Sequence, residues 1–312
     1  MPQIANADAD DGVAAPATSL FVTAQDGLRL HVRDYGARLA RALPVVCLPG
    51  LARTAADFDS LAVTLLSACR RRVFALDYRG RGKSDYDRNP ANYSLQVELA
   101  DVIAVLTALG IPRAAFVGTS RGGILTMLLA VARPTAIAGC VLNDIGPVIE
   151  LEGLMRIKGY VGKLPQPASF DEAADTLRQR FGSHFPKWDD GDWLAFAHRT
   201  FKEEGARIVP DYDPALATIL AGVSPDQPLP PLWREFDALA HIPVMVVRGT
   251  NSDILSAATV QAMRERRRGL EVVEVPDEGH APRLSDVATA DRITAFVASC
   301  DGGGPIDGGV YS

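Results

Sequence analysis

The sequence predicts an α/β fold with a mostly parallel, eight-stranded sheet flanked by helices and interrupted by an inserted helical cap. Short β-branched apolar runs alternate with longer segments of helical period, which is the pattern of strands joined by crossover helices. Between residues 147 and 237 the strand-like runs disappear, whereas proline and aromatic residues become more frequent. Strand-like runs then resume. We therefore expect a core formed by 20–146 and 238–300, with the cap at 147–237.

The expected elements of the core follow in order. A hairpin that turns near Asp26-Gly27 is predicted for LFVTAQDG and LRLHVRDYG. Four buried strands that end in turns are predicted for PVVCLPG, RVFALDYRG, AAFVGTS and AGCVLNDIG. Apolar residues three and four apart from Leu95 to Leu109 predict a crossover helix with one buried face. After the cap, two strands are predicted for PVMVVRG and LEVVEVPDEGH, and a closing helix for SDVATADRITAFVASC.

The ends of the chain and the cap have their own local patterns. Residues 1–19 are acidic and small, without the basic and apolar stretches of a signal peptide, and 301–312 are rich in glycine. Both are expected to be disordered tails. Within the cap, Ser169 and Glu172 form a capping-box pattern that predicts the start of a helix.

Composition excludes several classes of partner. The net charge is −6 and the basic residues are scattered, so no nucleic acid is expected. No apolar stretch reaches the length of about 18 residues typical of a membrane-spanning helix, so no membrane is expected. The cysteines are far apart and form no C-x-x-C pair, which fits a reducing cytoplasm and argues against a zinc cluster. A small-molecule substrate remains as the expected partner, and a homo-oligomer is left open.

A glycine-flanked serine is the candidate nucleophile. The segment Gly118-Thr119-Ser120-Arg121-Gly122 has the G-x-S-x-G pattern and lies between the predicted strand AAFV and the apolar run ILTMLLAVA. A serine on so tight a strand-to-helix turn needs small neighbours, and its hydroxyl projects from the carboxyl edge of the sheet. A glycine-rich turn with a capping serine is the alternative. The strand-turn-helix setting favours a nucleophile at Ser120.

A serine hydroxyl needs a base at neutral pH, and His280 is the candidate. It lies in PDEGHAP, directly after the last predicted strand and therefore at the same sheet edge as Ser120. The remaining histidines, in the hairpin, in the cap and before a strand, are interpreted as structural or substrate-facing: His31, His184, His198 and His241.

The base needs a carboxylate to fix its tautomer, and two aspartates follow predicted strands. Asp253, in RGTNSDIL, gives the chain order Ser, Asp, His. Asp144, in VLNDIGP, is the alternative acid. We favour Asp253 and interpret Asp144 as a residue that anchors its loop by accepting backbone hydrogen bonds.

Four segments together resemble the α/β-hydrolase superfamily in its serine-nucleophile, helical-cap form. They are Leu48-Pro49-Gly50-Leu51, Asp77 to Ser84, Gly118 to Gly122 and Gly279-His280. The family usually has His-Gly after the third strand, where this chain has Pro49-Gly50, so only the backbone role carries over. The resemblance implies an oxyanion hole formed by the backbone N–H groups of Leu51 and Arg121.

The segment from Asp77 to Ser84 is expected to be a structural loop. Its basic residues lack the G-x-x-x-x-G-K-[ST] pattern of a phosphate-binding loop. The predicted chemistry requires neither a metal nor an organic cofactor.

Large apolar residues of the cap are expected to determine substrate specificity. The candidate pocket residues are Met155, Tyr160, Trp188, Trp193 and Trp233. Phe185 and Phe196 have the same character. Such residues also form the internal core of a cap, so both roles stay open for each of them.

These residues predict a carboxylesterase-like or lactonase-like serine hydrolase. It would cleave a carboxylic ester, thioester or lactone with a hydrophobic portion through an acyl-enzyme on Ser120. The resemblance also leaves open carbon–carbon bond hydrolysis and haloperoxidase-like chemistry. A non-catalytic small-molecule receptor is an alternative of a different class, because a fold alone does not fix function.

Overall fold

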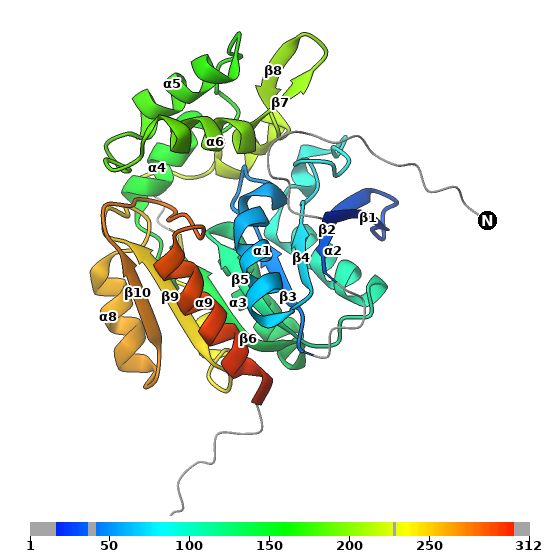
Figure 1. The fold of residues 1–312 in the computed structure, drawn as a ribbon, viewed down its shortest axis with the longest axis vertical. Helices are drawn as coiled ribbons and strands as arrows, with labels where there is room; N and C mark the ends of the chain where they lie inside the picture. Colours follow the sequence, from blue (N-terminus) through cyan, green and yellow to red (C-terminus); the bar gives the residue numbers. More distant parts are fainter. Residues whose placement is uncertain (1–16, 37–41, 227–228, 303–312) are drawn as a thin grey trace, which may run out of the picture.

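The computed structural model describes residues 17–36, 42–226 and 229–302. Within these residues an eight-stranded sheet has the strand order β1-β2-β4-β3-β5-β6-β9-β10 (Figure 1). Its strands are β1 (Ala17–Thr23), β2 (Arg29–Tyr35), β3 (Val45–Leu48), β4 (Val73–Leu76), β5 (Ala114–Thr119), β6 (Ile137–Asn143), β9 (Val244–Gly249) and β10 (Glu271–Val275). β2 pairs antiparallel with β1 and β4, and every other pair is parallel. The predicted sheet is confirmed.

Helices cover both faces of this sheet (Figure 1). One face is packed by α1 (Asp59–Cys69) and α9 (Val287–Ser299). The other is packed by α2 (Leu95–Ala108), α3 (Arg121–Ala132), α7 (Trp233–Asp237) and α8 (Ala257–Arg266). Successive strand residues point to opposite faces, so Val46 belongs to the second core, whereas Val45 and Cys47 belong to the first.

The segment from Leu151 to Leu220, called the cap here, lies at one end of the sheet (Figure 1). It contains α4 (Leu151–Tyr160), α5 (Phe170–Phe181), α6 (Asp190–Thr200), β7 (Phe201–Glu204), β8 (Arg207–Pro210) and the 3-10 helix η4 (Pro214–Leu220). The short 3-10 helices elsewhere are η1 (Ala55–Phe58), η2 (Pro90–Asn92), η3 (Pro134–Ala136) and η5 (Cys300–Gly302). The β7–β8 hairpin contradicts the prediction that strands are missing from this region. Gly205, with a φ of 63°, permits its tight turn.

The start of α5 follows the predicted capping pattern only in part. Ser169 Oγ accepts a hydrogen bond from the Glu172 N–H at 3.1 Å, but the Glu172 carboxylate accepts from the Ala168 N–H instead of that of Ser169. The complete capping box lies at α6, between Asp189 and Asp192.

Both predicted tails include residues that belong to the fold. β1 begins at Ala17, so the tail predicted for 1–19 extends too far, and its residues 1–16 lie outside the described residues. At the other end, Asp301 accepts hydrogen bonds from Arg71 and from the Leu43 N–H. Residues 301–302 are therefore part of the fold, and 303–312 lie outside the described residues.

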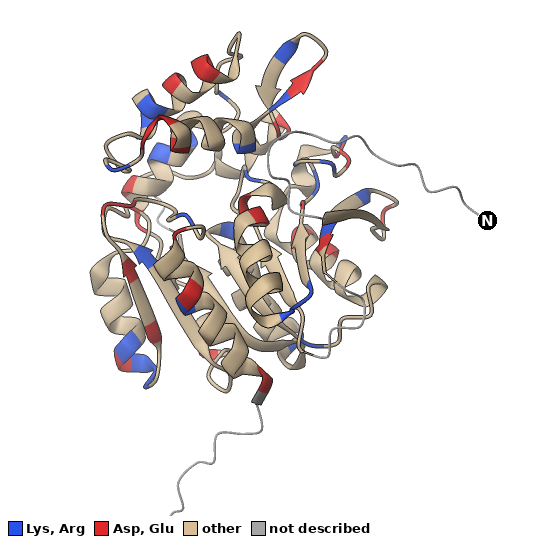
Figure 2. Ribbon diagram, viewed as in Figure 1, with Lys and Arg blue, Asp and Glu red and all other residues tan. Residues whose placement is uncertain are grey.

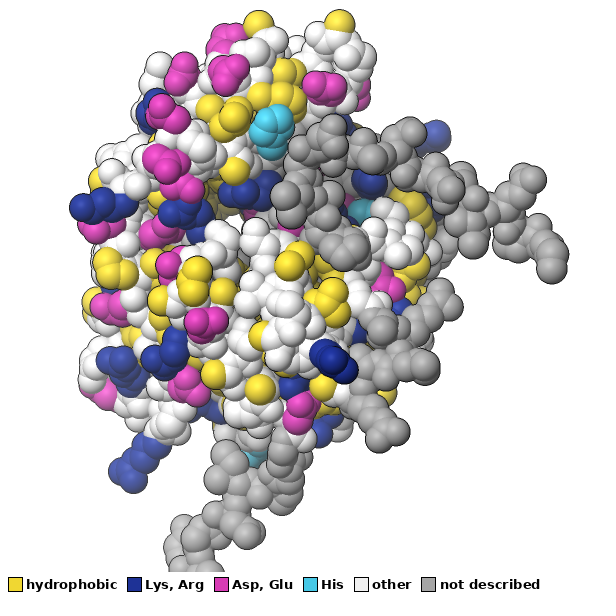
Figure 3. All heavy atoms as spheres, viewed as in Figure 1, with side chains coloured by type: hydrophobic (Ala, Val, Ile, Leu, Met, Phe, Trp, Pro, Cys, Tyr) yellow, Lys and Arg dark blue, Asp and Glu magenta, His cyan; other side chains and the backbone are white. Residues whose placement is uncertain are grey.

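The folded chain has the scattered charges that its composition predicts (Figures 2 and 3). Figure 2 shows acidic and basic residues interspersed along the core and the cap, and Figure 3 shows side chains of both signs on the face in view. Among the described residues, no helix is both long and apolar enough to span a membrane. The four cysteines are unpaired.

Candidate active site

Ser120 lies at the turn between β5 and α3, with a φ of 51° and a ψ of −113°. A non-glycine residue at such angles costs about 1–3 kcal/mol and persists only where its surroundings hold it. The Ser120 N–H donates to the Asn143 carbonyl oxygen at 3.0 Å, and the Ser120 carbonyl oxygen accepts from Gly123 and Ile124. The carboxyl end of β6 and the start of α3 thus fix this residue at the edge of the sheet.

Two glycines make this turn sterically accessible. A β-carbon added at Gly118 would lie 2.6 Å from the backbone of Gly122. One added at Gly122 would lie 1.9 Å from the carbonyl oxygen of Leu48 in β3. Both distances are far shorter than a van der Waals contact, and the atoms concerned belong to backbone that cannot rotate away. Packing therefore requires glycine on both sides of Ser120.

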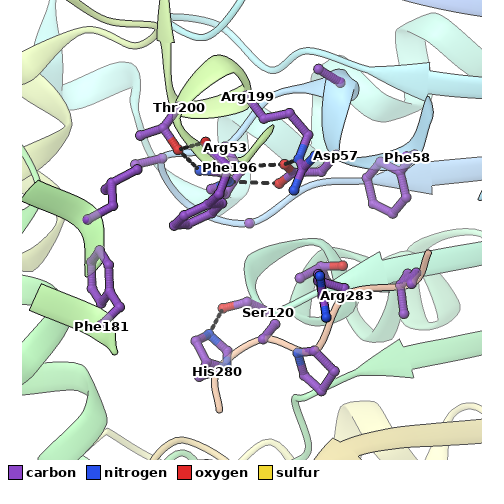
Figure 4. Close-up of a pocket in the computed structure, with 18 of the residues that line it drawn as sticks. Arg53, Asp57, Phe58, Ser120, Phe181, Phe196, Arg199, Thr200, His280 and Arg283 are labelled. Carbon is purple, nitrogen blue, oxygen red and sulfur yellow. Dashed lines mark hydrogen bonds and ion pairs between the residues drawn. The ribbon is translucent and has the colours of Figure 1, made fainter. Parts of the chain in front are cut away.

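The side chains of Ser120, His280 and Asp144 form one hydrogen-bonded chain. Nε2 of His280 lies 2.9 Å from Ser120 Oγ (Figure 4), and Nδ1 lies 2.8 Å from Asp144 Oδ2. An ionised carboxylate only accepts hydrogen bonds, so Asp144 keeps the proton on Nδ1 and leaves Nε2 to accept the Ser120 proton. The Asp144 side chain is fully buried, where such an interaction is stronger than in water.

The Asp144 carboxylate also anchors the neighbouring loop. Its Oδ1 accepts from the Gly249 N–H at 3.0 Å, and its Oδ2 accepts from Ser252 Oγ at 2.6 Å. Because β6 lies between β5 and β9, the residue that follows β6 is beside both the Ser120 turn and the loop after β9. The anchoring role interpreted from the sequence is present, together with a contact to the base.

The structure does not bring the predicted acid, Asp253, to His280, because its carboxylate is bound elsewhere. Both residues are described, and no hydrogen bond joins Asp253 to His280. Its carboxylate accepts from Nε of Arg156 at 2.5 Å and from Nη2 at 2.8 Å. Burial opposes ionisation of Asp253, but Arg156 holds its pKa below the usual 3.8. The Gly153 N–H also donates to the Asp253 carbonyl oxygen, so this residue ties the loop after β9 to α4.

The backbone of Leu51 and Arg121 borders the reaction centre. β3 pairs with β5 in a register that places Leu48 opposite Gly118, so the loop after β3 lies beside the Ser120 turn. Leu51 lines the same two cavities as Ser120, and Arg121 lines one of them. Among the described residues, neither N–H donates to a carbonyl oxygen in a turn or loop. Their position is compatible with the predicted oxyanion hole, whose assignment stays a prediction.

One buried carboxylate connects these two residues. Glu98 of α2 accepts from Nη1 of Arg81 at 2.7 Å and from Nε of Arg121 at 2.5 Å. Arg81 in turn donates from Nε to the Leu51 carbonyl oxygen at 2.8 Å. Burial alone would raise the pKa of Glu98, but the two arginines lower it below its usual value, so the group is ionised at neutral pH. The sequence analysis missed Glu98, because one acidic residue in a helix gives no sign of its partners.

The segment from Asp77 to Ser84 is a structural loop, as predicted. Asp77 accepts from the Ala55 N–H at 2.6 Å and is 2.7 Å from Nδ1 of His31. The guanidinium of Arg79 is paired with three carboxylates: Asp26, Asp87 and Asp101. These charges are used within the fold. Among the described residues, no group of three or more His, Cys, Asp or Glu is arranged to hold a metal ion.

Two cavities meet at Ser120. The larger, of about 830 Å³, lies between the sheet edge and the cap, and polar and charged side chains form much of its wall. The smaller, of about 580 Å³, is lined mainly by leucine, isoleucine and valine, which come from α2, α3, α4, η4 and the loops beside them. Leu51, Ser120 and Ile157 line both. A substrate at Ser120 can therefore extend into two different environments.

The structure places two of the five predicted pocket residues at a cavity. Tyr160 and Trp188 line the larger cavity, as do Phe185 and Phe196. Met155, Trp193 and Trp233 line neither cavity, contrary to the prediction of their place. Trp193 is 1% exposed within the core of the cap, and Trp233 packs on Phe236 in α7. Helical spacing shows that a residue is buried but not which neighbour buries it.

Four arginines line the larger cavity, and the sequence analysis missed them all: Arg33, Arg53, Arg199 and Arg283. Three are paired with nearby carboxylates: Arg33 with Asp59, Arg53 with Asp57, and Arg283 with Glu278 and Asp192. In Figure 4, Arg53, Asp57 and Arg199 lie across the cavity from Ser120 and His280. Single arginines in different segments resemble surface residues until the cap brings them together.

Comparison with known proteins shows which family the chain belongs to. The sequence model of the alpha/beta hydrolase family matches residues 45–292, which is most of the chain. The chain belongs to the alpha/beta hydrolase family. The predicted resemblance is thereby confirmed, and with it the hydrolase class of the protein.

Individual hydrolases match along nearly the whole fold. A 3-hydroxybutyrate-oligomer hydrolase from Cupriavidus necator is 33% identical over 251 residues, which is 78% of this chain and 84% of the relative. A 2-(acetamidomethylene)succinate hydrolase from Mesorhizobium japonicum is 27% identical over 255 residues, or 80% of this chain and 85% of the relative. The crystal structure of an alpha/beta hydrolase from Novosphingobium aromaticivorans has a TM-score of 0.85 and 42% identity, covering 92% of this chain and 99% of that one.

Proposed function

We propose that this α/β hydrolase is a serine hydrolase that cleaves a carboxylic ester, thioester or lactone with a hydrophobic portion. The observation that carries the proposal is the hydrogen-bonded chain from Ser120 through His280 to Asp144, with 2.9 Å and 2.8 Å between its heavy atoms. Nucleophile, base and orienting acid are within the hydrogen-bond reach that this chemistry needs. Asp144 therefore replaces Asp253 as the proposed acid.

In the first step, Ser120 Oγ attacks the carbonyl carbon while Nε2 of His280 takes the hydroxyl proton. The carbonyl oxygen becomes an oxyanion, which the N–H groups of Leu51 and Arg121 stabilise. Each such donor is worth about 3 kcal/mol in related sites. The tetrahedral intermediate collapses when His280 gives its proton to the leaving oxygen or sulfur, and the acyl group stays on Ser120.

In the second step, water attacks the acyl-enzyme and gives its proton to Nε2 of His280. Collapse of the second tetrahedral intermediate returns that proton to Ser120 Oγ and releases the carboxylic acid. Asp144 remains ionised throughout and stabilises the imidazolium that forms in each step. No redox step or external co-reactant other than water is needed.

Two further observations support an ester-type substrate. The smaller cavity offers an apolar volume of about 580 Å³ directly beside Ser120, which suits the hydrophobic portion. The relative from Cupriavidus necator is named as a hydrolase of 3-hydroxybutyrate oligomers. Cleavage of an oligomer of a hydroxy acid supports an acyl-oxygen bond as the target here.

The test is hydrolysis of p-nitrophenyl esters of increasing acyl length by the purified chain and by its Ser120→Ala variant. We expect turnover that falls by at least about 10⁴-fold in the variant. The matched control is Ser67→Ala, which removes an exposed hydroxyl that donates to the Thr64 carbonyl oxygen on α1. It should keep full activity.

The same experiment separates the proposal from its alternatives. Faster cleavage of acetates than of all longer esters would exclude the apolar cavity as an acyl site. Equal turnover by the Ser120→Ala variant would exclude the nucleophile. Absence of turnover in both proteins, with no labelling of Ser120 by a fluorophosphonate, would favour a receptor or a narrow chemistry other than ester cleavage.

A further inference from the structure

We propose that Arg199 binds a free carboxylate of the substrate, so that the enzyme acts on esters with an apolar part on one side of the scissile bond and a carboxylate on the other. This inference rests on the proposed function and specifies its substrate class. The observation behind it is that arginines line the larger of the two cavities that meet at Ser120, whereas apolar residues line the smaller.

Arg199 is placed where an extended substrate would reach it. It belongs to the last turn of α6, and it lines the larger cavity together with Ser120 and His280. Figure 4 shows it across that cavity from the Ser120–His280 pair. The Arg199 side chain is 29% exposed, so it is accessible to a ligand without being fully solvated.

The charge of Arg199 is not matched by a carboxylate of its own. Its Nε lies 3.7 Å from Oδ1 of Asp57, which is longer than a hydrogen bond. Asp57 is already bound by Arg53 through Nε at 2.7 Å and Nη2 at 2.5 Å, and the third Arg53 nitrogen donates to Thr200. The Arg199 guanidinium donates no hydrogen bond to the side chain or backbone of another described residue. Two guanidinium groups therefore share one carboxylate.

The other charged groups around the cavity all have partners of opposite charge. Asp59 accepts two hydrogen bonds from Arg33, at 2.8 Å and 2.7 Å. Glu278 is paired with Arg283, which also contacts Asp192. Asp57 and Asp59 are the carboxylates among the described residues that line the cavity, and each is bound by an arginine. An entering carboxylate therefore meets no unpaired anion there, and Arg199 is the lining guanidinium without a hydrogen-bonded carboxylate.

The surroundings make an anion a favourable ligand. Burial, followed by the nearby Arg53 and Arg283, lowers the pKa of Arg199 against the opposing effect of Asp57. A guanidinium stays protonated at neutral pH in any case. Binding a carboxylate relieves the repulsion among the cations and adds charge-assisted hydrogen bonds, which are stronger than neutral ones.

The smaller cavity has the opposite character. Apolar residues dominate its wall, for example Ile124, Ile145 and Leu220. Its one charged lining residue among those described is Arg121, which donates to the buried Glu98. A carboxylate is thus stabilised in the larger cavity, and an alkyl chain is stabilised in the smaller one. This difference orients the ester across Ser120.

The test compares esters that differ only in the carboxylate. One pair is 4-nitrophenyl hydrogen glutarate and 4-nitrophenyl pentanoate, with the charge on the acyl side. The second is 3-butanoyloxybutanoate and its methyl ester, with the charge on the alcohol side. We expect kcat/KM to favour the carboxylate by about tenfold or more in at least one pair, and Arg199→Gln to abolish that preference. The control Arg207→Gln makes the same charge change at an exposed ion pair on β8, and it should keep the preference.

Binding gives a readout that does not depend on turnover. Calorimetric titration of the same esters into Ser120→Ala should give a Kd about tenfold lower for the charged member of the preferred pair, and Ser120→Ala/Arg199→Gln should bind both members equally. Equal Kd values for charged and neutral esters in the Ser120→Ala variant, or a preference that survives Arg199→Gln, would overturn the carboxylate site. Failure of the proposed function is a different result: none of the four esters is hydrolysed by the wild-type chain.

Discussion

Nδ1 of His280 and Oδ2 of Asp144 lie 2.8 Å apart, although 136 positions separate the two residues in the chain. The strand order brings them together, since β6 is the immediate neighbour of the strand that leads to Ser120. The aspartate after β9 is one strand further away, and it is bound by Arg156. The two aspartates should therefore respond differently to the same substitution.

Asp144→Asn should lower kcat by about 10⁴-fold, because an amide can donate to Nδ1 and so favour the wrong imidazole tautomer. Asp253→Asn should leave kcat within about threefold and lower the free energy of unfolding by about 1–3 kcal/mol, since Arg156 loses its charged partner. Ester hydrolysis and urea denaturation measure the two effects. Equal loss of kcat in both variants, with unchanged stability, would contradict the assignment of Asp144.

The ion pair between Asp253 and Arg156 should make stability depend on pH in acid. The pKa of Asp253 is lowered in the folded chain from its usual 3.8, so the folded state favours the ionised carboxylate. Its contribution is complete above pH 3.8 and is lost as the pH falls through the lower, folded value. The difference in unfolding free energy between the wild type and Asp253→Asn should thus be constant from pH 7 to about pH 5 and shrink below 3.8. Urea titrations across this range measure it, and a difference that grows in acid would contradict the sign.

Glu98→Gln should lower kcat by about tenfold while KM changes less than twofold. Its carboxylate holds both Arg121 and, through Arg81, the Leu51 carbonyl, so its loss should displace the two N–H groups proposed to stabilise the oxyanion. Stability should also fall by about 3–5 kcal/mol, since two buried guanidinium groups lose their partner. Activity is therefore compared at a temperature where circular dichroism shows both proteins folded.

A second carboxylate on the same helix is the control for Glu98. Asp101 binds Arg79 through two hydrogen bonds of 2.7 Å and does not contact the residues at the reaction centre. Asp101→Asn should lower stability without lowering kcat in the folded protein. A similar kcat in both variants would show that Glu98 supports the fold and not the oxyanion site.

Two glycine-to-alanine substitutions should have opposite effects on stability. Gly122→Ala places a β-carbon 1.9 Å from the Leu48 carbonyl oxygen and should cost at least about 3 kcal/mol. Gly159→Ala, in α4, meets no atom within 4 Å and should stabilise the chain by about 0.5–1 kcal/mol through lower backbone entropy of the unfolded state. Thermal denaturation measures both changes. A stable Gly122→Ala variant would mean that the turn at Ser120 has more room than its contacts indicate.

Local patterns predicted the sheet, the Ser120 turn and the place of His280 because each depends on neighbours in sequence. The choice between Asp144 and Asp253 could not be made this way. Both follow strands whose ends are adjacent at one edge of the sheet, so only the direction of each side chain distinguishes them. That direction depends on Arg156, which comes from the cap.

The cap was the least predictable part for the same reason. Its hairpin consists of FKEE and RIVP, whose charges hide the strand character, and only Gly205 between them indicates a turn. Trp193 and Trp188 lie five positions apart in the chain and both belong to the core of the cap, yet Trp188 also lines the cavity and Trp193 does not. Contacts between distant segments, and not local periodicity, decide which face of a cap helix meets the substrate.

Among the residues that the structure describes, the two cavities at Ser120 have Leu51, Ser120 and Ile157 in common. Substitutions elsewhere in one wall consequently leave the other wall unchanged, and free-energy effects at separated sites usually add within about 0.5 kcal/mol. Selectivity for the two halves of a substrate can then diverge independently during evolution. A hydrolase with two such cavities can come to accept a new acyl group or a new alcohol by substitutions in one cavity. The residues that perform the reaction then stay unchanged.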